Sequence, residues 1–231
     1  MTDALLSIEH LEFRWPRERE PVLDELNLSL SQAETVFLAG ASGSGKSTLL
    51  ALIGGLMVPT AGSIRLADQA LETLGGAARD RLRADHVGII FQQLNLLPWL
   101  DAFGNVRLGV RFSKRRRARV DDVDAAARQL LEAMELPASH WHRPANQLSI
   151  GQQQRVAAAR ALIGAPDLIL ADEPTSALDA DRRDRFVELL FAQARAAGSA
   201  VLFVSHDRAL AGRFDRQLEL TALHRAGAAA C

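Results

Sequence analysis

The segment GASGSGKS at residues 40–47 constrains the fold of this chain more than any other feature. It fits the pattern GxxxxGK[ST], follows an apolar run at 36–39 and opens a helix-length segment at 46–57. Between a strand and a helix, the glycines let successive backbone N–H groups turn inward around a phosphate. The alternative is a glycine-rich turn that binds nothing, but a chance match in a chain of this length has a probability of about 1%.

The loop supplies the first candidate site residues. Lys46 is expected to reach the terminal phosphates of a nucleotide, and Ser47 is expected to offer an oxygen to Mg²⁺. The predicted nucleotide-binding residues of the loop are Gly40, Ala41, Ser42, Gly43, Ser44, Gly45, Lys46, Ser47 and Thr48.

Runs that are apolar on both faces recur along the chain, which is typical of buried parallel strands. They lie at 36–39, 87–91, 168–171 and 201–204. Helix-length segments between them lie at 46–57, 120–135 and 182–197. This alternation predicts an α/β fold with a mostly parallel central sheet.

Two parts of the chain depart from the alternation. Residues 5–38 read as short strands broken by the charged turn RWPREREP, which predicts an N-terminal antiparallel β subdomain at the edge of the main sheet. Residues 93–164 contain no convincing strand and two proline breaks, which predicts an inserted helical subdomain. Because strand patterns resume at 168, we expect one domain over 1–231, with 1–92 and 165–231 as its nucleotide-binding core.

Composition narrows the function classes. The 27 basic and 28 acidic residues leave a formal net charge of -1, so no nucleic-acid partner is expected. The single cysteine, Cys231, excludes an internal disulfide and fits a reducing compartment. The longest apolar stretch, 49–58, is about half of the ~20 residues that a membrane helix needs. The sequence therefore predicts a cytoplasmic chain that meets a membrane only through a partner.

Polar side chains follow two of the predicted buried strands. Asp172 and Glu173 come directly after 168–171, at the sheet edge where open α/β folds place their ligands. Asp172 is expected to hold Mg²⁺, and Glu173 to accept a proton from an attacking water; the alternative is a solvated strand end. His206 follows 201–204 and is expected to reach the γ-phosphate, with a structural histidine as the alternative.

Other charged groups receive no functional role from the sequence. These are His10, His86, His140, His142 and His224. The basic run KRRRAR at 114–119 is interpreted as a solvated loop, in preference to a contact with anionic lipid or a partner.

The residues LSIGQ at 148–152, followed by QQR, resemble the LSGGQ signature of ABC-type ATPases, a family of P-loop NTPases. Further motifs of that family follow the same order along nearly the whole chain. They are Trp15, the glycine loop, Gln92, the signature, the DEP segment at 172–174, the SALD segment at 176–179 and His206.

The resemblance implies a head-to-tail, ATP-dependent homodimer and Mg²⁺ as the second cofactor. ATP would lie between the glycine loop of one subunit and the partner's signature residues, Ser149, Gly151 and Gln152. Trp15 would stack on adenine, with a packing role as the alternative. Gln92 would sense Mg²⁺ and the attacking water, and Asp179 would communicate across the dimer. The helical subdomain would contact an integral membrane permease, which would keep the chain peripheral on the cytoplasmic face of the inner membrane.

Within the family, GIIFQQLNLLP at 88–98 resembles the lipoprotein-releasing and macrolide-exporting branch, which implies an exporter with a separate permease. Two alternatives remain open: an ATPase that regulates a cell-division or wall-hydrolase permease, and a soluble ABC ATPase. The sequence departs from the family at Ile150, which replaces the first glycine of the signature pair, and at Ala33, where the family commonly has glycine. We expect Ile150 to have ordinary helical backbone and a side chain directed away from the nucleotide.

Overall fold

The computed structural model describes residues 4–223, so His224 and Cys231 lie outside the described residues. It contains two sheets. The first is antiparallel, with the order β2-β1-β4-β5. Its strands are β1 (Leu6–Phe13), β2 (Leu23–Leu30), β4 (Ala61–Leu66) and β5 (Gln69–Ala70). The second is parallel, with the order β6-β7-β8-β3-β9. Its strands are β3 (Thr35–Ala39), β6 (Val87–Ile90), β7 (Leu168–Asp172), β8 (Ala200–Val204) and β9 (Arg216–Glu219).

The antiparallel strands confirm the predicted β subdomain, but the predicted position at the edge of the main sheet is wrong. Strand β1 pairs with β2 on one side and β4 on the other, so that Leu6 lies opposite both Leu30 and Leu66. These strands form a sheet of their own. The reason is that β4, which the sequence pattern did not reveal, supplies the partner strand that β1 would otherwise lack.

The parallel sheet confirms the four predicted buried strands and lies between two apolar cores. On one face, Phe37, Ile169 and Phe203 pack with the helices of the second half of the chain. On the other face, the core extends to the antiparallel sheet and includes Leu49 and Leu52 of α1 (Lys46–Ile53). Helix α1 is thus held by both sheets, and its N-terminal end lies where β3 delivers the glycine loop.

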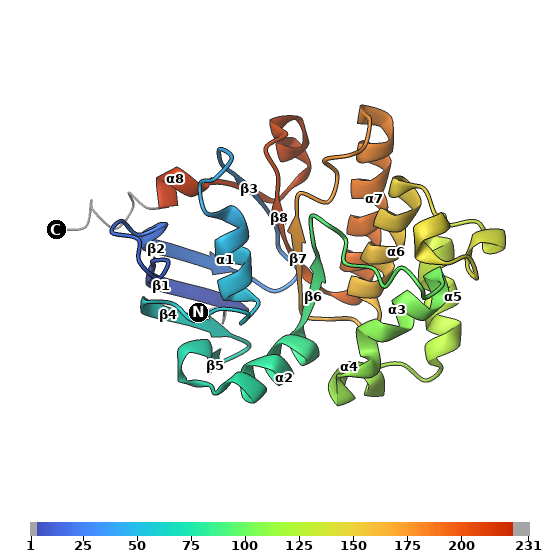
Figure 1. The fold of residues 1–231 in the computed structure, drawn as a ribbon, viewed down its shortest axis with the longest axis horizontal. Coiled ribbons are helices and arrows are strands. Elements are labelled where there is room, and N and C mark those ends of the chain that lie inside the picture. The colour runs from blue at the N-terminus through green and yellow to red at the C-terminus, as the bar shows by residue number, and fades with distance from the viewer. Residues whose placement is uncertain (1–3, 224–231) are drawn as a thin grey trace.

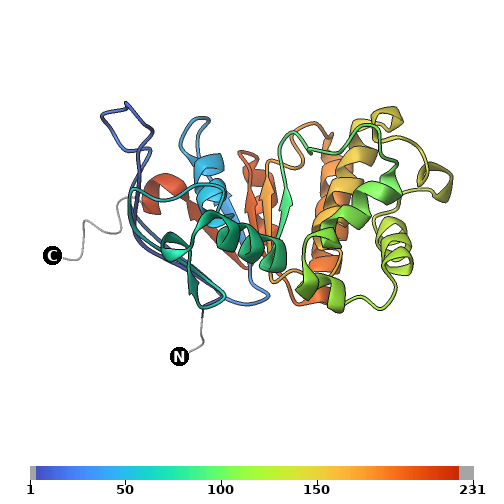
Figure 2. The same ribbon diagram turned by 60° about the horizontal axis from the view of Figure 1, so that its bottom comes forward.

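The remaining helices are α2 (Gly76–His86), α3 (Ala102–Arg111), α4 (Lys114–Ala118), α5 (Val123–Ala133), α6 (Ile150–Leu162), α7 (Ala180–Ala197) and α8 (Leu220–Leu223). Most of these helices pack on the other face of the parallel sheet, but α2 and α8 contribute Leu82 and Leu220 to the core that contains α1. Figures 1 and 2 show α3 to α6 together at the opposite end of the molecule from the antiparallel sheet. Within residues 4–223, no helix is both long and apolar enough to cross a bilayer.

Capping residues set the helix boundaries that periodicity predicted less accurately. Helix α5 begins at Val123, not at 120, because the Asp122 carboxylate accepts the N–H groups of Asp124 and Ala125. Helix α7 begins at Ala180, before the predicted 182, because Asp179 is its N-cap. Helix α1 ends at Ile53, since Gly54 is its C-cap, and does not continue to 57.

The interpretation of the basic run as a solvated loop is wrong. Residues 114–118 form helix α4, and the Arg116 side chain is buried. Its guanidinium donates hydrogen bonds to the backbone oxygens of Val87, Ala161 and Ile163. Burial lowers the pKa of Arg116 to about 10. Because this one side chain satisfies three carbonyls, one at the start of β6 and two at the end of α6, it holds α4 against the parallel sheet and against the end of α6.

Two further arginines of the run converge on Asp167, which immediately precedes β7. Arg115 and Arg119 approach its two carboxylate oxygens at 3.0 and 3.1 Å. His86, to which the sequence gave no role, is buried against the same carboxylate. Although burial opposes ionisation, the hydrogen bonds from His86 and Arg119 lower the pKa of Asp167 to about 2. This cluster joins α2, α4 and β7.

Candidate nucleotide site

The glycine loop has the backbone that its sequence predicted. Gly43 and Gly45 have φ values of 76° and 99°, in the left-handed region that favours glycine. A Cβ atom at Gly45 would lie 2.9 Å from a methyl carbon of Val22, so a side chain there has no room. Gly45 is also the N-cap of α1 and contributes no side-chain cap, which leaves N–H groups of the first turn open for an anion.

One polar group of the loop supports a phosphate ligand independently. The Ser44 hydroxyl is buried and has no hydrogen-bond partner among the described residues. A buried hydroxyl without a partner costs free energy unless a ligand or water satisfies it. The loop therefore fits a phosphate group in its chemistry as well as in its shape.

Lys46 lies inside the loop and not out in solvent. Its side chain is 6% exposed, and its ammonium donates to the backbone oxygens of Gly40 and Ala41 at 2.8 and 2.7 Å. These two contacts keep a positive charge beside the open N–H groups. The loop thus concentrates positive charge at the point where the sequence placed the terminal phosphates.

Ser47 and Asp172 lie within hydrogen-bond distance of each other, although 125 positions separate them in the chain. Burial raises the pKa of the Asp172 carboxyl, and the hydrogen bond from Ser47 opposes that rise. A hydroxyl and a carboxylate beside a phosphate loop are suitable oxygen ligands for Mg²⁺. Within the described residues no three His, Cys, Asp or Glu side chains form a metal cluster, so the protein offers few ligands of its own. A Mg²⁺ ion bound mainly through phosphate oxygens and water fits this donor set.

Glu173 and His206 lie together at the carboxyl edge of the parallel sheet. The Glu173 carboxylate is 3.2 Å from Nδ1 of His206, and its side chain is 17% exposed against 64% for the histidine. Glu173 has a φ of 44°, which is unusual for a residue with a side chain, and its N–H donates to the oxygen of Val204 on the neighbouring strand. The sequence predicted both residues but not their pairing, which follows from the adjacency of β7 and β8.

The signature segment forms the start of a helix. Ser149 is the N-cap of α6, and it makes a capping box with Gln152 in which each side chain accepts the other's backbone N–H. Ile150 is the first helical residue, has no positive φ and is 57% exposed. The expectation of ordinary helical backbone at this position is therefore confirmed.

A contact in this segment was missed from the sequence. The Gln152 amide nitrogen lies 3.4 Å from Nδ1 of His140, which precedes it by twelve residues in a 3₁₀ turn. No periodicity or motif links the two positions, so only the fold reveals their contact. Gly151 lies between the capping residues, and its added Cβ would make ordinary contact with Leu178 at 3.5 Å.

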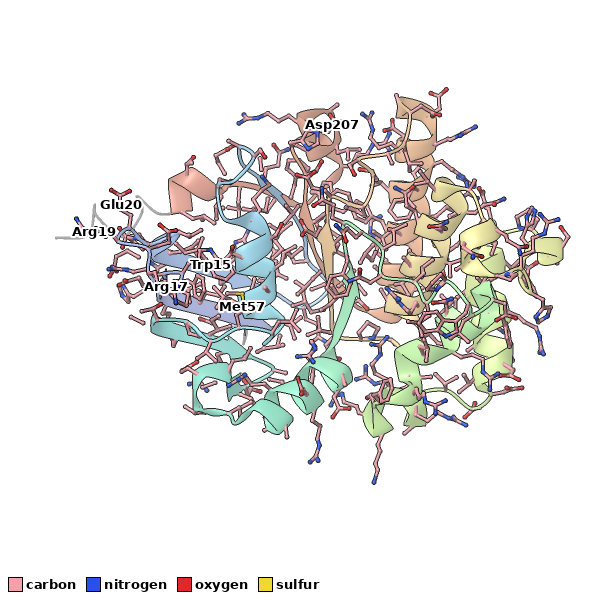
Figure 3. The ribbon with its side chains drawn as sticks, viewed as in Figure 1. Trp15, Arg17, Arg19, Glu20, Met57 and Asp207 are labelled. Carbon is pink, nitrogen blue, oxygen red and sulfur yellow. The ribbon has the colours of Figure 1, made fainter. Side chains whose placement is uncertain are left out.

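Three further predicted residues lie on separate elements. Trp15 follows β1 in the connection to β2 (Figure 3), where it is 44% exposed and makes an edge-to-face contact with Phe13 at a ring distance of 5.1 Å. Gln92 lies in an exposed turn after β6, and among residues 4–223 its side chain has no hydrogen-bond partner. Asp179 accepts a hydrogen bond from the N–H of Arg182 at the start of α7. Thr48 is half-buried on α1 and Ser42 is exposed in the loop.

The glycine loop and the Ser149 segment are not joined to each other within the described chain. No hydrogen bond or ion pair among residues 4–223 joins the Ser149 segment to the glycine loop. The structure thus brings the loop together with Asp172, and Glu173 with His206, while the signature belongs to the helical end of the molecule (Figure 1).

Comparison with known proteins shows the family to which this chain belongs. Residues 23–176 match the family model described as ABC transporter. The chain belongs to this family, as one of its ATP-binding, ATP-hydrolysing subunits.

Relatives and solved structures indicate which branch of the family this chain resembles. The lipoprotein-releasing system ATP-binding protein LolD of Xanthomonas oryzae pv. oryzae is 43% identical over 202 residues, which are 87% of this chain and 81% of the relative. LolD of Hydrogenovibrio crunogenus is 40% identical over 226 residues, 97% of this chain and 96% of the relative. The dimeric post-hydrolysis structure of the ATP-binding cassette MJ0796, bound to ADP and Pi, matches with a TM-score of 0.82 and 33% identity over 93% of each chain. The predicted resemblance to the lipoprotein-releasing branch is confirmed.

Proposed function

We propose that this chain is the ATP-hydrolysing subunit of a lipoprotein-releasing exporter. It works as an ATP-dependent, head-to-tail homodimer that is peripheral on the cytoplasmic face of the inner membrane through a separate permease. The names of its relatives support lipoprotein release over control of a wall-hydrolase permease. The observation that supports the proposed dimer is that the glycine loop and the Ser149 segment are separate from each other within one chain.

The signature helix is built to receive an anion from outside its own chain. Helix α6 has 13 residues and no acidic residue in its first turn, so its N-terminal dipole is not neutralised locally. The capping box uses the N–H of Gln152 but leaves those of Ile150 and Gly151 unused. In a head-to-tail pair, Ser149 and these N–H groups of one subunit would contact the phosphates held by the glycine loop of the other.

Residues on the loop side would carry the hydrolysis step. Ser47 and Asp172 would hold Mg²⁺, which when bound neutralises negative charge on the terminal phosphates. Glu173 accepts the proton of the attacking water, and its low exposure protects that carboxylate from bulk solvent. His206 fixes the Glu173 carboxylate through the 3.2 Å contact and can turn a ring N–H toward the γ-phosphate. Gln92, with an unengaged amide, is free to respond to the Mg²⁺ ion and the water.

The permease would dock on a groove of about 360 Å³ beside Gln92. One wall carries Phe91 and Leu97 after β6, and the other carries Leu108 and Phe112 of the helical subdomain, which we assign to about 93–164. A segment inserted there would contact the core and the helical subdomain at once. Movement of the turn at Gln92 would therefore reach the permease directly.

Mixed dimers test the head-to-tail arrangement. In a Glu173→Gln background with ATP and Mg²⁺, a tagged Lys46→Ala chain should capture an untagged Ser149→Phe chain, because the pair retains one intact composite site. It should not capture an untagged Lys46→Ala copy, in which both sites lack the lysine. Equal capture of both chains, or of neither, would show that the two segments do not act in trans.

Co-purification tests the permease. From detergent-solubilised membranes, the tagged chain should retain a multi-helix membrane protein, and Leu108→Glu in the groove should release it. Leu223→Glu, which places the same charge on a half-buried leucine of α8, is the matched control and should retain the partner. Retention by both variants would remove the groove from the proposal.

A further inference from the structure

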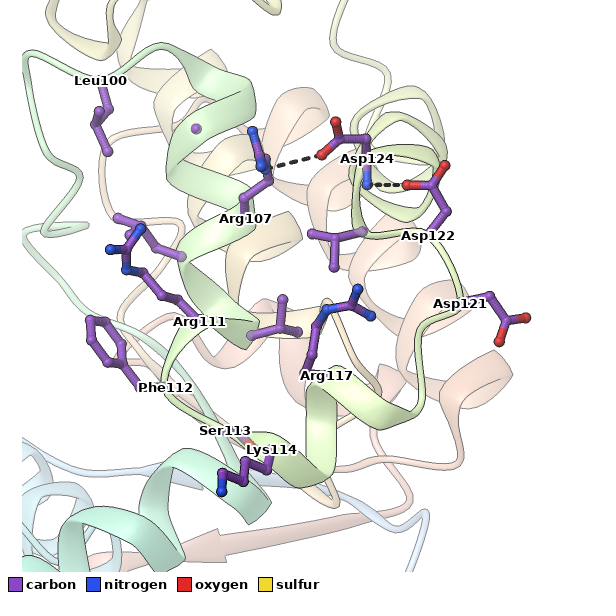
Figure 4. Close-up of a pocket in the computed structure, with 14 residues that line it drawn as sticks. Leu100, Arg107, Arg111, Phe112, Ser113, Lys114, Arg117, Asp121, Asp122 and Asp124 are labelled. Atoms are coloured by element: carbon purple, nitrogen blue, oxygen red, sulfur yellow. Dashed lines mark hydrogen bonds and ion pairs between the residues drawn. The ribbon is translucent and has the colours of Figure 1, made fainter.

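A second, larger groove lies between α3, α4 and α5, and it opens on the surface of the helical subdomain. Its volume is about 920 Å³. Figure 4 shows Arg111, Phe112 and Lys114 along the junction of α3 and α4, with Asp121 and Asp122 on the opposite side. Four lining residues, Arg111, Phe112, Lys114 and Arg117, are named here the α3–α4 patch. None of them takes part in the nucleotide site.

The cations of this patch are not used by the fold. Among residues 4–223, the side chains of Arg111 and Lys114 have no hydrogen bond or ion pair. Arg117 donates a hydrogen bond to the backbone oxygen of Val120, and its charge helps to lower the pKa of Asp122. In the same basic run, by contrast, Arg116 is buried and Arg115 is paired with Asp167. The run therefore separates into an inner set that holds α4 in place and an outer set that faces solvent.

The acidic residues across the groove offset only part of this charge. Asp124 is paired with Arg107 at 3.1 Å, and the Asp122 carboxylate accepts two N–H groups at the start of α5. Asp121 is the remaining carboxylate of the groove lining. The groove lining thus carries four cations, Arg107, Arg111, Lys114 and Arg117, against three carboxylates. The charged side chains of the α3–α4 patch itself are all cationic.

An exposed aromatic ring lies among these cations. Phe112 is 76% exposed, so its apolar ring lacks the stabilisation that burial would give. Long basic side chains around an exposed phenyl ring match the membrane interface, where cations meet headgroup phosphates and an aromatic ring enters the boundary with the acyl chains. Flexible, unfixed cations also suit lipid headgroups, which are mobile and adjust to them.

We propose that the α3–α4 patch binds the headgroups of anionic phospholipids at the membrane surface. This inference rests on the proposed function, because the proposed permease contact sets where the patch lies relative to the membrane. Leu108, Phe112 and Ser113 line both this groove and the one assigned to the permease. A permease seated in the smaller groove would bring the adjoining patch to the bilayer that surrounds it. The lipid contact would then orient the helical subdomain against the membrane while the core responds to ATP.

Vesicle sedimentation with the purified full chain tests the proposal without any permease. The chain should bind sucrose-loaded vesicles that contain about 30 mol% phosphatidylglycerol, and binding should fall between about 50 mM and about 300 mM salt. It should not bind phosphatidylcholine vesicles. Each cation near such a surface contributes about a fivefold change in partitioning, equivalent to about 1 kcal/mol, so R111E/K114E should weaken binding at least ~25-fold.

A matched double variant controls for net charge. R19E/R65E makes the same change in formal charge on exposed arginines of the antiparallel subdomain and should bind at least ~10-fold better than R111E/K114E. Phe112→Ser should lower binding with little change in its salt dependence. Equal loss in both double variants, equal binding to neutral vesicles, or no binding to anionic vesicles would overturn the lipid assignment. Because no permease is present, these outcomes leave the mixed-dimer and co-purification tests independent.

Discussion

Asp167→Asn should destabilise the fold by about 2 kcal/mol at neutral pH. In the native protein this carboxylate faces Arg115, Arg119 and His86, which hold its pKa at about 2 against an ordinary value of 3.8. At about 1.36 kcal/mol for each pH unit, that difference corresponds to about 2.4 kcal/mol of stabilisation. We take about 2 kcal/mol, because the 11% of the side chain that remains exposed allows some solvent screening.

The same pKa fixes the pH dependence and its sign. A carboxyl whose folded pKa is depressed contributes its full stabilisation above the unfolded pKa and loses it as the pH falls toward the folded pKa. For Asp167 the window runs from about pH 4.5 down to about 2, and roughly 1.1 kcal/mol should be lost by pH 3. In Asp167→Asn this contribution to the acid destabilisation should be absent, because the amide does not titrate.

Urea unfolding followed by tryptophan fluorescence measures both effects. The variant should show a lower free energy of unfolding at pH 7 and a shallower loss between pH 5 and pH 3 than the parent. Glu135→Gln is the matched control, because Glu135 also binds two arginines and its pKa is also lowered, but it lies at the surface. It should cost at most ~1 kcal/mol. An Asp167→Asn variant within about 0.5 kcal/mol of the parent, or no more affected than Glu135→Gln, would refute this reasoning.

Four further substitutions test the site and the backbone. Glu173→Gln should keep ATP affinity, lower turnover at least ~10²-fold and accumulate ATP-loaded dimers on size exclusion. Turnover at the rate of the parent protein would contradict the assignment of Glu173 as the general base. Lys46→Ala should lose nucleotide in a titration with a fluorescent ATP analogue, and unchanged affinity would contradict the phosphate site. Ile150→Gly should change ATP-dependent dimerisation by less than about 1.4 kcal/mol in sedimentation experiments on a Glu173→Gln background; a hundredfold tightening would show that Ile150 restrains closure. Ala33→Gly should stabilise the fold by roughly 0.5–1 kcal/mol in urea unfolding, because Ala33 has a φ of 58°, and a loss of stability would contradict that strain.

The motifs were predictable from the sequence because they encode local backbone. The alternation of apolar runs with helical segments indicated the parallel sheet. The glycine spacing indicated a loop in which some residues adopt the left-handed backbone conformation. Strand β4 was missed because AGSIRL begins with two weak strand formers and its partner, β1, lies about fifty residues earlier. Strand β9 is a four-residue polar segment, and its pairing with β3 depends on a contact across most of the chain.

The basic run shows that a charge pattern alone does not predict which of its residues are buried. The five basic residues of KRRRAR look alike in sequence, yet Arg116 is buried and Lys114 is exposed. Arg116 is buried because it donates to the backbone oxygens of Val87, 29 residues before it, and of Ala161 and Ile163, 45 and 47 residues after it. Carbonyl acceptors have no sequence signal at all. A run of like charges therefore predicts its environment only after its partners are placed.

The two segments proposed to bind ATP differ in how much side chain they tolerate, and the structure explains why. Gly45 has a φ of 99° and lies against Val22, so a larger residue would meet both backbone strain and a steric clash. Ile150 begins a helix with ordinary backbone and projects a 57% exposed side chain, while the flanking capping box fixes the helix start. We therefore expect the signature to depend on the cap formed by Ser149 and Gln152. This is why the departure at Ile150 is compatible with an active ATPase, whereas the same substitution at Gly45 would remove the phosphate loop.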